Sequence, residues 1–515
     1  MTPARSFEEA RRAAQAEFDS RVPQKVRNER GQFATPPDLA RAMLCLAERY
    51  LPDRPIRFLD PALGTGVFYH ALLSIYGSER IASAAGFEVD GELAGITARF
   101  WGECGLKVEH ADFTGAEPGE GLDRADLIVC NPPYVRHHHL QQESKMRLKR
   151  AATDVGFKLN GLAGLYAYFL LLADRWLAAN GIAVWIIPAE VLDVNYGTEV
   201  KRYLLENVTT HVVHRFAPED VQFDDALVTS VILLFQKQTP CKAHRIAFTS
   251  GTDLLKPTFE RTILSEQLDA ESKWGLIFNN STAASYHSDG RQSVLSDFFD
   301  IKRGLATGAN DFFILEQTRA LDLGLPQEFL QPILPSQREI ASTIIESDTE
   351  GFPARLPRFV LLDCPLPREE IEQGYPKLHN YLKRGEAQHL PQRYLPSSRR
   401  PWYRQEYRPP APILCSYMAR KKGDGTIFRF FRNHSKATAA NVWLLLYPNA
   451  ALKAALRTSP DLLDTVFQYL QCATGVELVG RVYGGGLNKI EPRELGNLPL
   501  PDDIKTLIQQ SAMRM

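Results

Sequence analysis

The chain has 515 residues, enough for two or three domains, and its 44% hydrophobic and 23% charged content is ordinary for a water-soluble protein. No apolar run is long enough to cross a bilayer, and the charged N-terminus lacks the apolar core of a secretory signal. The formal net charge of -1 gives no global preference for nucleic acid, so such a partner would need a local basic patch. Seven cysteines without a CxxC pair favour reduced thiols in a cytoplasm over disulfides or a zinc site.

The first half of the chain alternates between strand-like and helix-like segments. Residues 1–30 predict a polar helical lead-in, and Thr35 before two prolines predicts the start of a helix. Strands are expected at residues 56–60, 84–90, 107–113, 125–130, 181–188, 211–216 and 229–237. Because helical segments follow most of these strands, we expect an α/β domain with a doubly wound, mostly parallel sheet over residues 31–238. The last two strands leave no room for a helix between them, which predicts a terminal antiparallel hairpin at one edge.

The second half of the chain has a different pattern. From residue 239 the alternation fades and prolines become frequent, as in LPRFVLLDCPLPREE and HLPQRYLPSSRRPWYRQEYRPPAPIL. No repeat period is present. Residues 239–515 therefore predict an irregular, mixed α+β domain, or two of them.

Acidic and glycine residues lie where the first strands end. DPALGTG (60–66) places Asp60 at a strand end, followed by glycines that allow a sharp turn; it is neither a Walker loop nor a complete dinucleotide fingerprint. Glu88 ends the second strand, where an acid commonly binds ribose hydroxyls. Asp112 and Phe113 end the third, an acid and a ring suited to an adenine amino group and its face. Any one acid could be a helix cap, but together they favour a nucleoside pocket.

The fourth strand ends in NPPY, residues 131–134. An exocyclic amino group on adenine is a poor nucleophile, since its lone pair is conjugated into the ring. The amide oxygen of Asn131 and the backbone carbonyl of Pro132 can accept both of its hydrogens and so favour attack by the nitrogen. Tyr134 can stack on the base. The alternative is a simple turn that terminates the strand.

In order, DPALGTGVF, GFEVD, ADF and NPPY resemble the motifs of S-adenosylmethionine-dependent methyltransferases, and QFATPP is similar to the N-terminal cofactor motif of the gamma class of DNA adenine-N6 methyltransferases. KRGLATGANDFFIL (302–315) and VYGGGLNKIEPRELGNLPLP (482–501) are similar to target-recognition segments of restriction–modification methyltransferases. The resemblance implies catalytic roles for Asn131, Pro132 and Tyr134. It implies S-adenosyl-L-methionine as cofactor, bound by Thr35, Asp60, Ala62, Gly64, Gly66, Glu88, Val89, Asp112, Phe113, Asn131 and Pro132.

A base in a duplex must leave the stack before it can react. The resemblance implies a second stacking ring just before the late hairpin, where Phe223 lies at the matching spacing and Phe216 is the competitor. Phe223 could instead be a core residue. HHH at 137–139 does not predict a metal site, because consecutive side chains diverge, and we expect no metal. With the basic residues up to Arg150, this stretch is either a DNA-facing loop or a solvated charge run.

Basic and aromatic residues are concentrated between Arg393 and Lys436. Positive charge for phosphates, with planar groups for bases, is what a DNA reader needs. The alternative is an ordinary basic surface with its aromatic residues in the core. YGGGLNK (483–489) could bring its backbone close to a phosphate or be a simple loop. The candidate DNA-binding residues are Arg399, Arg400, Arg404, Arg420, Lys421, Lys422 and Lys489.

These features together predict a site-specific DNA adenine methyltransferase that flips its target base. We expect a monomeric, cytoplasmic enzyme without membrane contact, which acts on double-stranded DNA in a bacterial restriction–modification system whose cognate endonuclease is a separate chain. The alternatives are a methyltransferase for RNA or protein glutamine, and a DNA-binding modification or defence subunit with an auxiliary catalytic domain. Methylation of a cytosine amino group is also open, since the same elbow could serve it.

Overall fold

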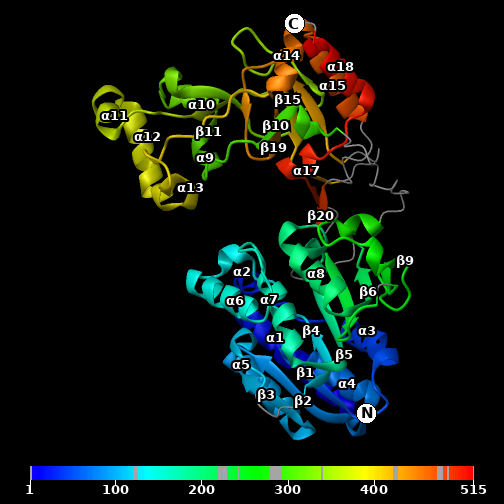
Figure 1. The fold of residues 1–515 in the computed structure, drawn as a ribbon. Coiled ribbons are helices and arrows are strands. Elements are labelled where there is room, and N and C mark those ends of the chain that lie inside the picture. Colours follow the sequence, from blue (N-terminus) through cyan, green and yellow to red (C-terminus); the bar gives the residue numbers. More distant parts are fainter. Residues whose placement is uncertain are drawn as a thin grey trace. The chain divides into compact units, whose positions relative to one another are not determined.

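The computed structural model describes residues 3–119, 124–217, 222, 229–241, 243–278, 293–337, 340–420, 427–472, 480–483 and 487–513. The chain divides into two compact units (Figure 1). The first unit comprises Met1–Ala284 with Tyr483–Gly486, and the second comprises Ser285–Val482 with Leu487–Met515. The boundary therefore falls later than the predicted residue 238.

The first unit is built on a nine-stranded sheet of order β3-β2-β1-β4-β5-β7-β6-β8-β9 among the described residues. The five strands β1 to β5 are mutually parallel, and β7 is antiparallel to both of its neighbours. This order confirms the doubly wound, mostly parallel α/β sheet. The strands are β1 (Ile56–Asp60), β2 (Ile81–Glu88), β3 (Leu106–His110), β4 (Ala125–Cys130), β5 (Leu177–Pro188), β6 (Thr209–Arg215), β7 (Ser230–Gln236), β8 (Arg245–Ser250) and β9 (Phe259–Leu264).

Helices flank this sheet (Figure 1). They are α1 (Pro3–Arg21), α2 (Gln24–Arg30), α3 (Pro37–Ala47), α4 (Val67–Tyr76), α5 (Gly91–Trp101), α6 (Gln142–Asp154), α7 (Leu165–Leu172) and α8 (Thr198–Glu206). α3 begins with proline in its first turn and buries Leu39, Met43 and Leu44 on one face, where it packs against α4. β4 is buried at every residue, as expected for a strand covered on both faces. This burial holds β4, and therefore the residues that follow it, in a fixed position.

The antiparallel pair predicted at the end of the sheet is present, but it does not form the edge. β7 lies between β5 and β6, and β8 and β9 extend the sheet beyond β6. β8 pairs in parallel with β6, and its Ile246 and Phe248 enter the core. The alternating apolar residues of β8 are buried only when β8 is part of this sheet. The first unit therefore extends past residue 238.

The second unit contains a sheet of order β10-β19-β15-β17-β13, a second of order β11-β14-β12-β18, and a third of order β16-β21-β20. Most of its neighbouring strands are antiparallel, which fits the predicted mixed α+β domain. Its strands are β10 (Phe299–Arg303), β11 (Ile314–Glu316), β12 (Leu330–Leu334), β13 (Ile344–Ile345), β14 (Phe359–Leu362), β15 (Ile413–Ser416), β16 (Met418–Arg420), β17 (Phe430–Asn433), β18 (Thr438–Ala439), β19 (Trp443–Pro448), β20 (Arg481–Tyr483) and β21 (Leu487–Lys489).

The helices of the second unit surround separate hydrophobic clusters. Leu444 and Phe467 belong to one cluster, Phe313 and Leu378 to a second, and Leu414 with Phe431 to a third. No helix within the described residues combines the length and the apolar character of a membrane span. The helices are α9 (Asn310–Phe313), α10 (Gln317–Asp322), α11 (Arg368–Gly374), α12 (Pro376–Ala387), α13 (Tyr394–Ser397), α14 (Ala450–Thr458), α15 (Leu462–Cys472), α17 (Pro492–Gly496) and α18 (Asp502–Met513).

Candidate cofactor and substrate site

The carboxyl ends of β1, β2 and β4 meet at one edge of the first sheet. The strand order reverses at β1 and β4, because the chain adds β2 and β3 on one side and β5 on the other. Such a switch point leaves a crevice in which α/β proteins bind ligands. The sheet thus brings Asp60, Glu88 and Asn131 to a common edge.

The glycine loop after β1 is held by two carboxylates. The Ala62 N–H donates to Asp60 Oδ1 at 3.1 Å, and the Gly64 N–H donates to Glu88 Oε2 at 2.9 Å. The Asp90 N–H donates to the other oxygen, Glu88 Oε1, at 2.8 Å. Glu88 therefore fixes the shape of the loop, in addition to the ribose-binding role predicted for it.

Burial changes the protonation of this pair. Burial raises the pKa of Asp60 to about 8, despite the hydrogen bond from the Ala62 N–H, and the charge of Glu88 raises it further. Burial also raises the pKa of Glu88, while the N–H groups of Asp90 and Gly64 lower it. Asp60 Oδ2 is buried without a hydrogen-bond partner among the described residues. A buried carboxyl oxygen without a partner suits a ligand whose cationic or N–H group would favour the ionised, accepting form of Asp60.

Asn131 has a fixed orientation at the end of β4. Its Nδ2 donates to the Phe33 carbonyl at 3.1 Å and to Thr35 Oγ1 at 3.0 Å. Asn131 Oδ1 is buried and has no partner in the described part of the chain. Because both amide hydrogens are used, the free group at this position is the acceptor. Thr35, a predicted cofactor contact, thus orients the predicted catalytic amide.

Tyr134 is packed more closely than an open stacking surface would be. Its side chain is only 7% exposed, and its hydroxyl donates to the Ile186 carbonyl at 3.2 Å. The ring centroid lies 5.6 Å from that of Phe33 and 6.4 Å from that of Tyr166. The Tyr134 N–H donates to the Gly31 carbonyl at 3.1 Å. Any base at this site therefore reaches the limited part of the ring left uncovered.

Gly31 is a site residue that the sequence analysis did not single out. It follows α2 with a φ of +64°, and a Cβ built there would lie 2.3 Å from the Tyr134 backbone nitrogen. Only glycine fits both constraints. Its place directly after a helix and just before QFATPP is the signal that could have identified it.

Other predicted cofactor contacts have more ordinary surroundings. Phe113 is 2% exposed and packs against Phe87 and Phe169, so its face is closed in this structure. Asp112 accepts from the Thr114 N–H at 2.9 Å and so caps the 3₁₀ turn that follows it. This agrees with the alternative in which an acid at a strand end is a helix cap. The Asp112 carboxylate also pairs with Arg147 at 2.7 Å.

The remaining predicted residues of the first unit are spread widely. Val89 is 67% exposed, whereas Pro132 is buried in the elbow. Gly66 has a φ of +79° and begins α4. Phe223 lies outside the described residues. Phe216, its competitor, is fully buried against His214 and is a core residue.

In the second unit, Arg399 differs from its predicted role. Its guanidinium donates to the Ala306 carbonyl at 2.6 Å, the Thr307 carbonyl at 2.9 Å and Gln405 Oε1 at 2.8 Å. Burial lowers the pKa of Arg399. These contacts make Arg399 a brace between two segments of the unit, because its donors face backbone carbonyls.

The other predicted DNA-binding residues are closer to expectation. Arg400, Arg404 and Arg420 are exposed. Lys489 pairs with Glu491 at 2.7 Å and lies 5.2 Å from the centroid of the Tyr417 ring. Lys421 and Lys422 lie outside the described residues.

Most aromatic residues of the basic region are core residues. Tyr403, Tyr417, Phe428, Phe430 and Phe431 are buried, as in the alternative interpretation. Tyr407 differs, because its side chain is 74% exposed.

Arg303 was missed by the sequence analysis, although it lies in KRGLATGANDFFIL. It is exposed, and its guanidinium carbon lies 4.1 Å from the centroid of the Tyr417 ring. It therefore adds a cation beside Lys489. Its proximity to Tyr417 depends on strand pairing, so no local pattern reveals it.

The order of the first sheet and the loops at its strand ends define a class: a Rossmann-like methyltransferase fold with an additional C-terminal domain. Residues 276–515 match the family described as "Type II methyltransferase M.Eco57I, C-terminal domain", and residues 107–222 match "Eco57I restriction-modification methylase". The chain is therefore similar to type II restriction–modification methyltransferases.

Two similar proteins span nearly the whole chain. Type II methyltransferase M.AccI of Acinetobacter calcoaceticus is 27% identical over 93% of this chain and 86% of its own length. Type II methyltransferase M.XamI of Xanthomonas campestris pv. amaranthicola is 28% identical over 92% of this chain and 85% of its own.

Two solved structures share the fold at low identity. The type IIL restriction-modification enzyme MmeI in complex with DNA has a TM-score of 0.54 and 13% identity, over 83% of this chain and 61% of that one. The DrdV–DNA complex has a TM-score of 0.54 and 12% identity, over 99% of this chain and 60% of that one. This chain thus spans about three fifths of those longer chains.

Proposed function

We propose that the protein transfers a methyl group from S-adenosylmethionine to the exocyclic amino nitrogen of an adenine flipped out of duplex DNA. The observation that carries the proposal is the oriented amide of Asn131. Its hydrogens are bound by Phe33 and Thr35, and its buried oxygen accepts from no group that the structure describes. An acceptor at the end of a strand, at the switch point of this fold, suits a substrate that presents N–H groups.

The chemistry depends on polarising a weak nucleophile. The Asn131 oxygen and the Pro132 carbonyl would accept the two amino hydrogens and turn the nitrogen lone pair toward the methyl group. Positioned dipoles in a site that excludes water stabilise the transition state without a strong base. The Gly31 carbonyl holds the elbow by accepting from the Tyr134 N–H. The arrangement therefore supplies orientation, which is what this nucleophile lacks.

The residues at the ends of β1 and β2 fit the proposed cofactor. S-adenosylmethionine, when bound, supplies an electrophilic methyl group on a sulfonium. The unpaired Asp60 Oδ2 would accept from a cationic or N–H group of the cofactor. Glu88 would accept from the ribose hydroxyls with the lone pairs that its two backbone bonds leave available. Gly64 and Gly66 would allow close approach of the backbone.

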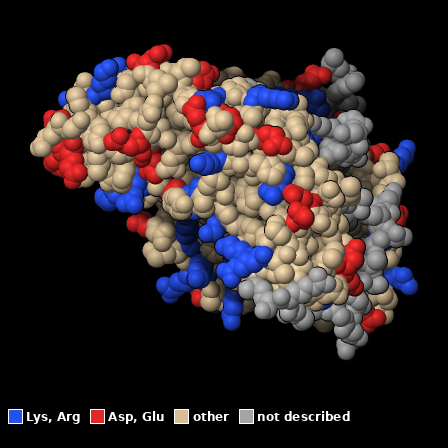
Figure 2. All heavy atoms as spheres, turned by 90° about the horizontal axis from the view of Figure 1, so that it is seen from above, with Lys and Arg blue, Asp and Glu red and all other residues tan. Residues whose placement is uncertain are grey.

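The second unit offers surfaces for DNA. Figure 2 shows Lys and Arg side chains gathered on one part of a face whose other parts also carry Asp and Glu. A hollow of about 420 Å³ in this unit is lined in part by Asn310, Gln388 and Asn441, with Arg393 beside them. Amide side chains pair with base edges and guanidinium groups with guanines or phosphates. We propose that this unit selects the target site.

The proposal extends to the setting in which the protein acts. We propose that the protein acts in a bacterial cytoplasm, as a monomer, and protects DNA from a cognate endonuclease carried by a separate chain. The similar proteins are named as type II methyltransferases, which supports the restriction–modification part of this proposal.

The proposal is tested by methylation-aware sequencing of DNA from a host that expresses the chain. We expect N6-methyladenine at one position of a recurring site, and none in cells expressing Asn131→Ala. Modification of a cytosine amino group would replace adenine in the proposal. If purified protein methylates RNA or a protein glutamine but not duplex DNA, the DNA assignment is wrong. Binding of DNA without methylation would indicate an auxiliary subunit.

Base flipping gives a second measurable expectation. A duplex with 2-aminopurine at the target position should brighten when the protein binds, because the base leaves its stacked neighbours. Tyr134→Ala should weaken capture of that base by about 1–3 kcal/mol. Tyr134→Phe keeps the ring and removes only the hydroxyl, which bonds to the Ile186 carbonyl, so it should behave nearly as wild type. If the alanine variant gives unchanged fluorescence and rate, Tyr134 does not stack on the base.

The same duplex tests the second ring. Phe223→Ala should weaken capture by a similar amount, whereas Phe216→Ala should mainly lower stability because Phe216 is in the core. An effect of Phe216→Ala on fluorescence alone, with Phe223→Ala silent, would assign the role to Phe216.

Arg404→Ala should weaken DNA binding and reduce the slope of log K against log salt by about 1, if this exposed guanidinium meets a phosphate. Arg99→Ala, at an exposed position of α5, is the matched control and should leave the slope unchanged. Arg399→Ala should instead lower the melting temperature, because it removes the brace to Ala306 and Thr307. Fluorescence anisotropy at several salt concentrations measures the DNA affinity of each variant and its dependence on salt. An unchanged slope for Arg404→Ala would remove this residue from the DNA surface.

A further inference from the structure

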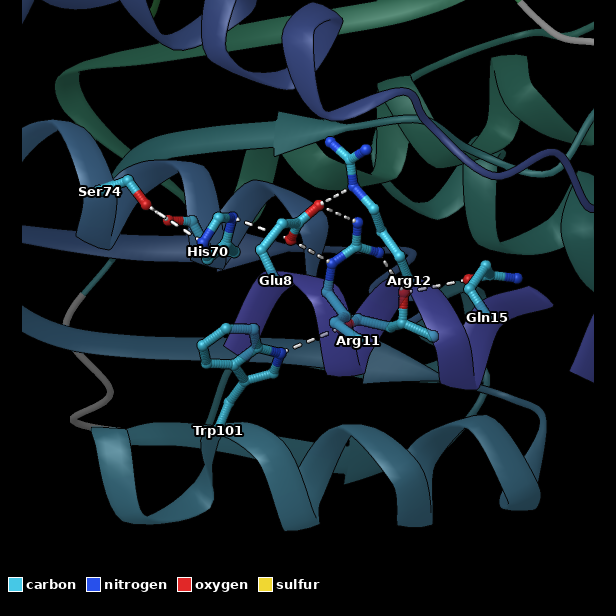
Figure 3. A network of polar contacts seen from close by, with 8 residues as sticks. Glu8, Arg11, Arg12, Gln15, His70, Ser74 and Trp101 are labelled. Carbon is cyan, nitrogen blue, oxygen red and sulfur yellow. Dashed lines mark hydrogen bonds and ion pairs between the residues drawn. The ribbon is translucent and has the colours of Figure 1, made fainter. Parts of the chain in front are cut away.

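The N-terminal helix α1 reaches the glycine loop through one buried arginine. Arg11 is only 4% exposed, and its Nη1 donates to Thr65 Oγ1 at 2.8 Å. Thr65 lies between Gly64 and Gly66 in the loop that follows β1. Figure 3 shows Arg11 between Glu8 and Gln15 on α1, with Trp101 of α5 nearby. A helix that would otherwise be a polar lead-in thus contacts the proposed cofactor site.

Arg11 is itself held in place by a carboxylate. Its Nε and Nη2 each donate to Glu8, at 2.8 Å, so the ion pair is bidentate. Burial by itself would raise the pKa of Glu8, but the guanidinium groups of Arg11 and Arg12 lower it to about 2. His70 Nδ1 on α4 lies 3.1 Å from Glu8 Oε2. The charged pair therefore persists at neutral pH, and it points Nη1 of Arg11 at the loop.

Other bonds from α1 and from α5 fix the same loop. Thr65 Oγ1 donates to Gln15 Oε1 at 3.0 Å, and the Thr65 carbonyl accepts from Trp101 Nε1 at 3.0 Å. The Gly64 carbonyl accepts from Thr97 Oγ1 at 2.6 Å. Each peptide of this segment is thus tied to α1 or to α5. The loop cannot change its shape without breaking one of these bonds.

We propose that Arg11 is a positioning residue for cofactor binding: through Thr65 it holds the glycine loop in the conformation that receives S-adenosylmethionine. The inference rests on the proposed function, since it assumes that this loop binds that cofactor. Arg11 does not touch the cofactor itself. A loop that is already ordered loses less conformational entropy when the cofactor binds, so ordering the loop raises the affinity for the cofactor.

The experiment measures the dissociation constant of S-adenosylmethionine by calorimetry, together with the melting temperature of each variant. Arg11→Ala should raise the dissociation constant about tenfold, the effect of losing one charge-assisted hydrogen bond. Arg12→Ala is the matched control, because Arg12 also pairs with Glu8, at 2.8 Å, but is exposed. It should leave the affinity within about twofold of wild type.

A double-mutant cycle separates positioning from general stability. Thr65→Val removes the acceptor but keeps the ion pair with Glu8, so it remains informative if Arg11→Ala folds poorly. It should reproduce the loss of affinity, and adding Arg11→Ala to it should cause little further loss. A lowered melting temperature with unchanged affinity in both single variants would overturn the inference.

Glu88→Gln distinguishes failure of the inference from failure of the function. If Glu88→Gln weakens binding while Arg11→Ala and Thr65→Val do not, the loop binds the cofactor and Arg11 plays no part. If wild-type protein does not bind S-adenosylmethionine, the proposed function is wrong and this inference falls with it.

Discussion

Asn131→Ala is expected to remove most methyl transfer while leaving the affinity for S-adenosylmethionine nearly unchanged. The amide oxygen is the unpaired acceptor at the proposed substrate position, and alanine has none. A preorganised group that acts on developing charge contributes roughly 10²–10³ in rate. The single-turnover rate on duplex DNA and the dissociation constant of the cofactor, measured separately, check this expectation.

The controls for Asn131 address orientation and generic damage. Thr35→Val removes one acceptor of the amide hydrogens but keeps the Phe33 carbonyl, so it should slow methyl transfer less than Asn131→Ala does. Asn207→Ala changes an exposed amide after α8 and should have no effect. A near-normal rate for Asn131→Ala would refute its catalytic assignment.

Gly31→Ala is expected to lose both stability and methyl transfer, although Gly31 carries no reactive group. At a φ of +64° any other residue is strained by roughly 1–2 kcal/mol. The added Cβ would also lie 2.3 Å from the Tyr134 nitrogen and 2.6 Å from its carbonyl carbon, so the NPPY elbow must shift. A displacement of about 1 Å in a positioned site can cost on the order of 10²-fold in rate.

Gly77→Ala separates the strain at Gly31 from its effect on the elbow. Gly77 has a φ of +75°, but a Cβ there meets nothing within 4 Å. Gly77→Ala should lower the stability through the same backbone strain, but it should keep the single-turnover rate. The melting temperature and the single-turnover rate of both variants distinguish the two effects. A Gly31→Ala protein that methylates normally would show that the Gly31–Tyr134 contact does not position the elbow.

Local patterns in the sequence located the strands β1 to β7, but not β8 and β9, which extend the sheet. The uninterrupted apolar run of β4 indicated a strand buried on both faces, and the prolines after it marked its end. Because parallel strands end at one edge, the order of Asp60, Glu88 and Asn131 along the chain predicted that they share a site.

The predicted second domain was less well defined by sequence. Its basic and aromatic residues alternate along the chain, but five of those aromatic residues enter the core and Arg399 braces backbone carbonyls. Charge and aromaticity are properties of the residue, whereas exposure depends on which strands and loops cover it.

By itself, the sequence determined the α/β class, the strand-end motifs and the polar elbow, because apolar periodicity and proline placement act within a few residues. The tertiary structure alone decided the extension of the sheet by β8 and β9, and the direction of the amide that we propose to be catalytic. The bond between Asn131 and Thr35 joins residues 96 positions apart, and Arg11 reaches Thr65 across 54. Hydrogen bonds over such separations depend on how the strands order themselves in the sheet, which no local pattern encodes.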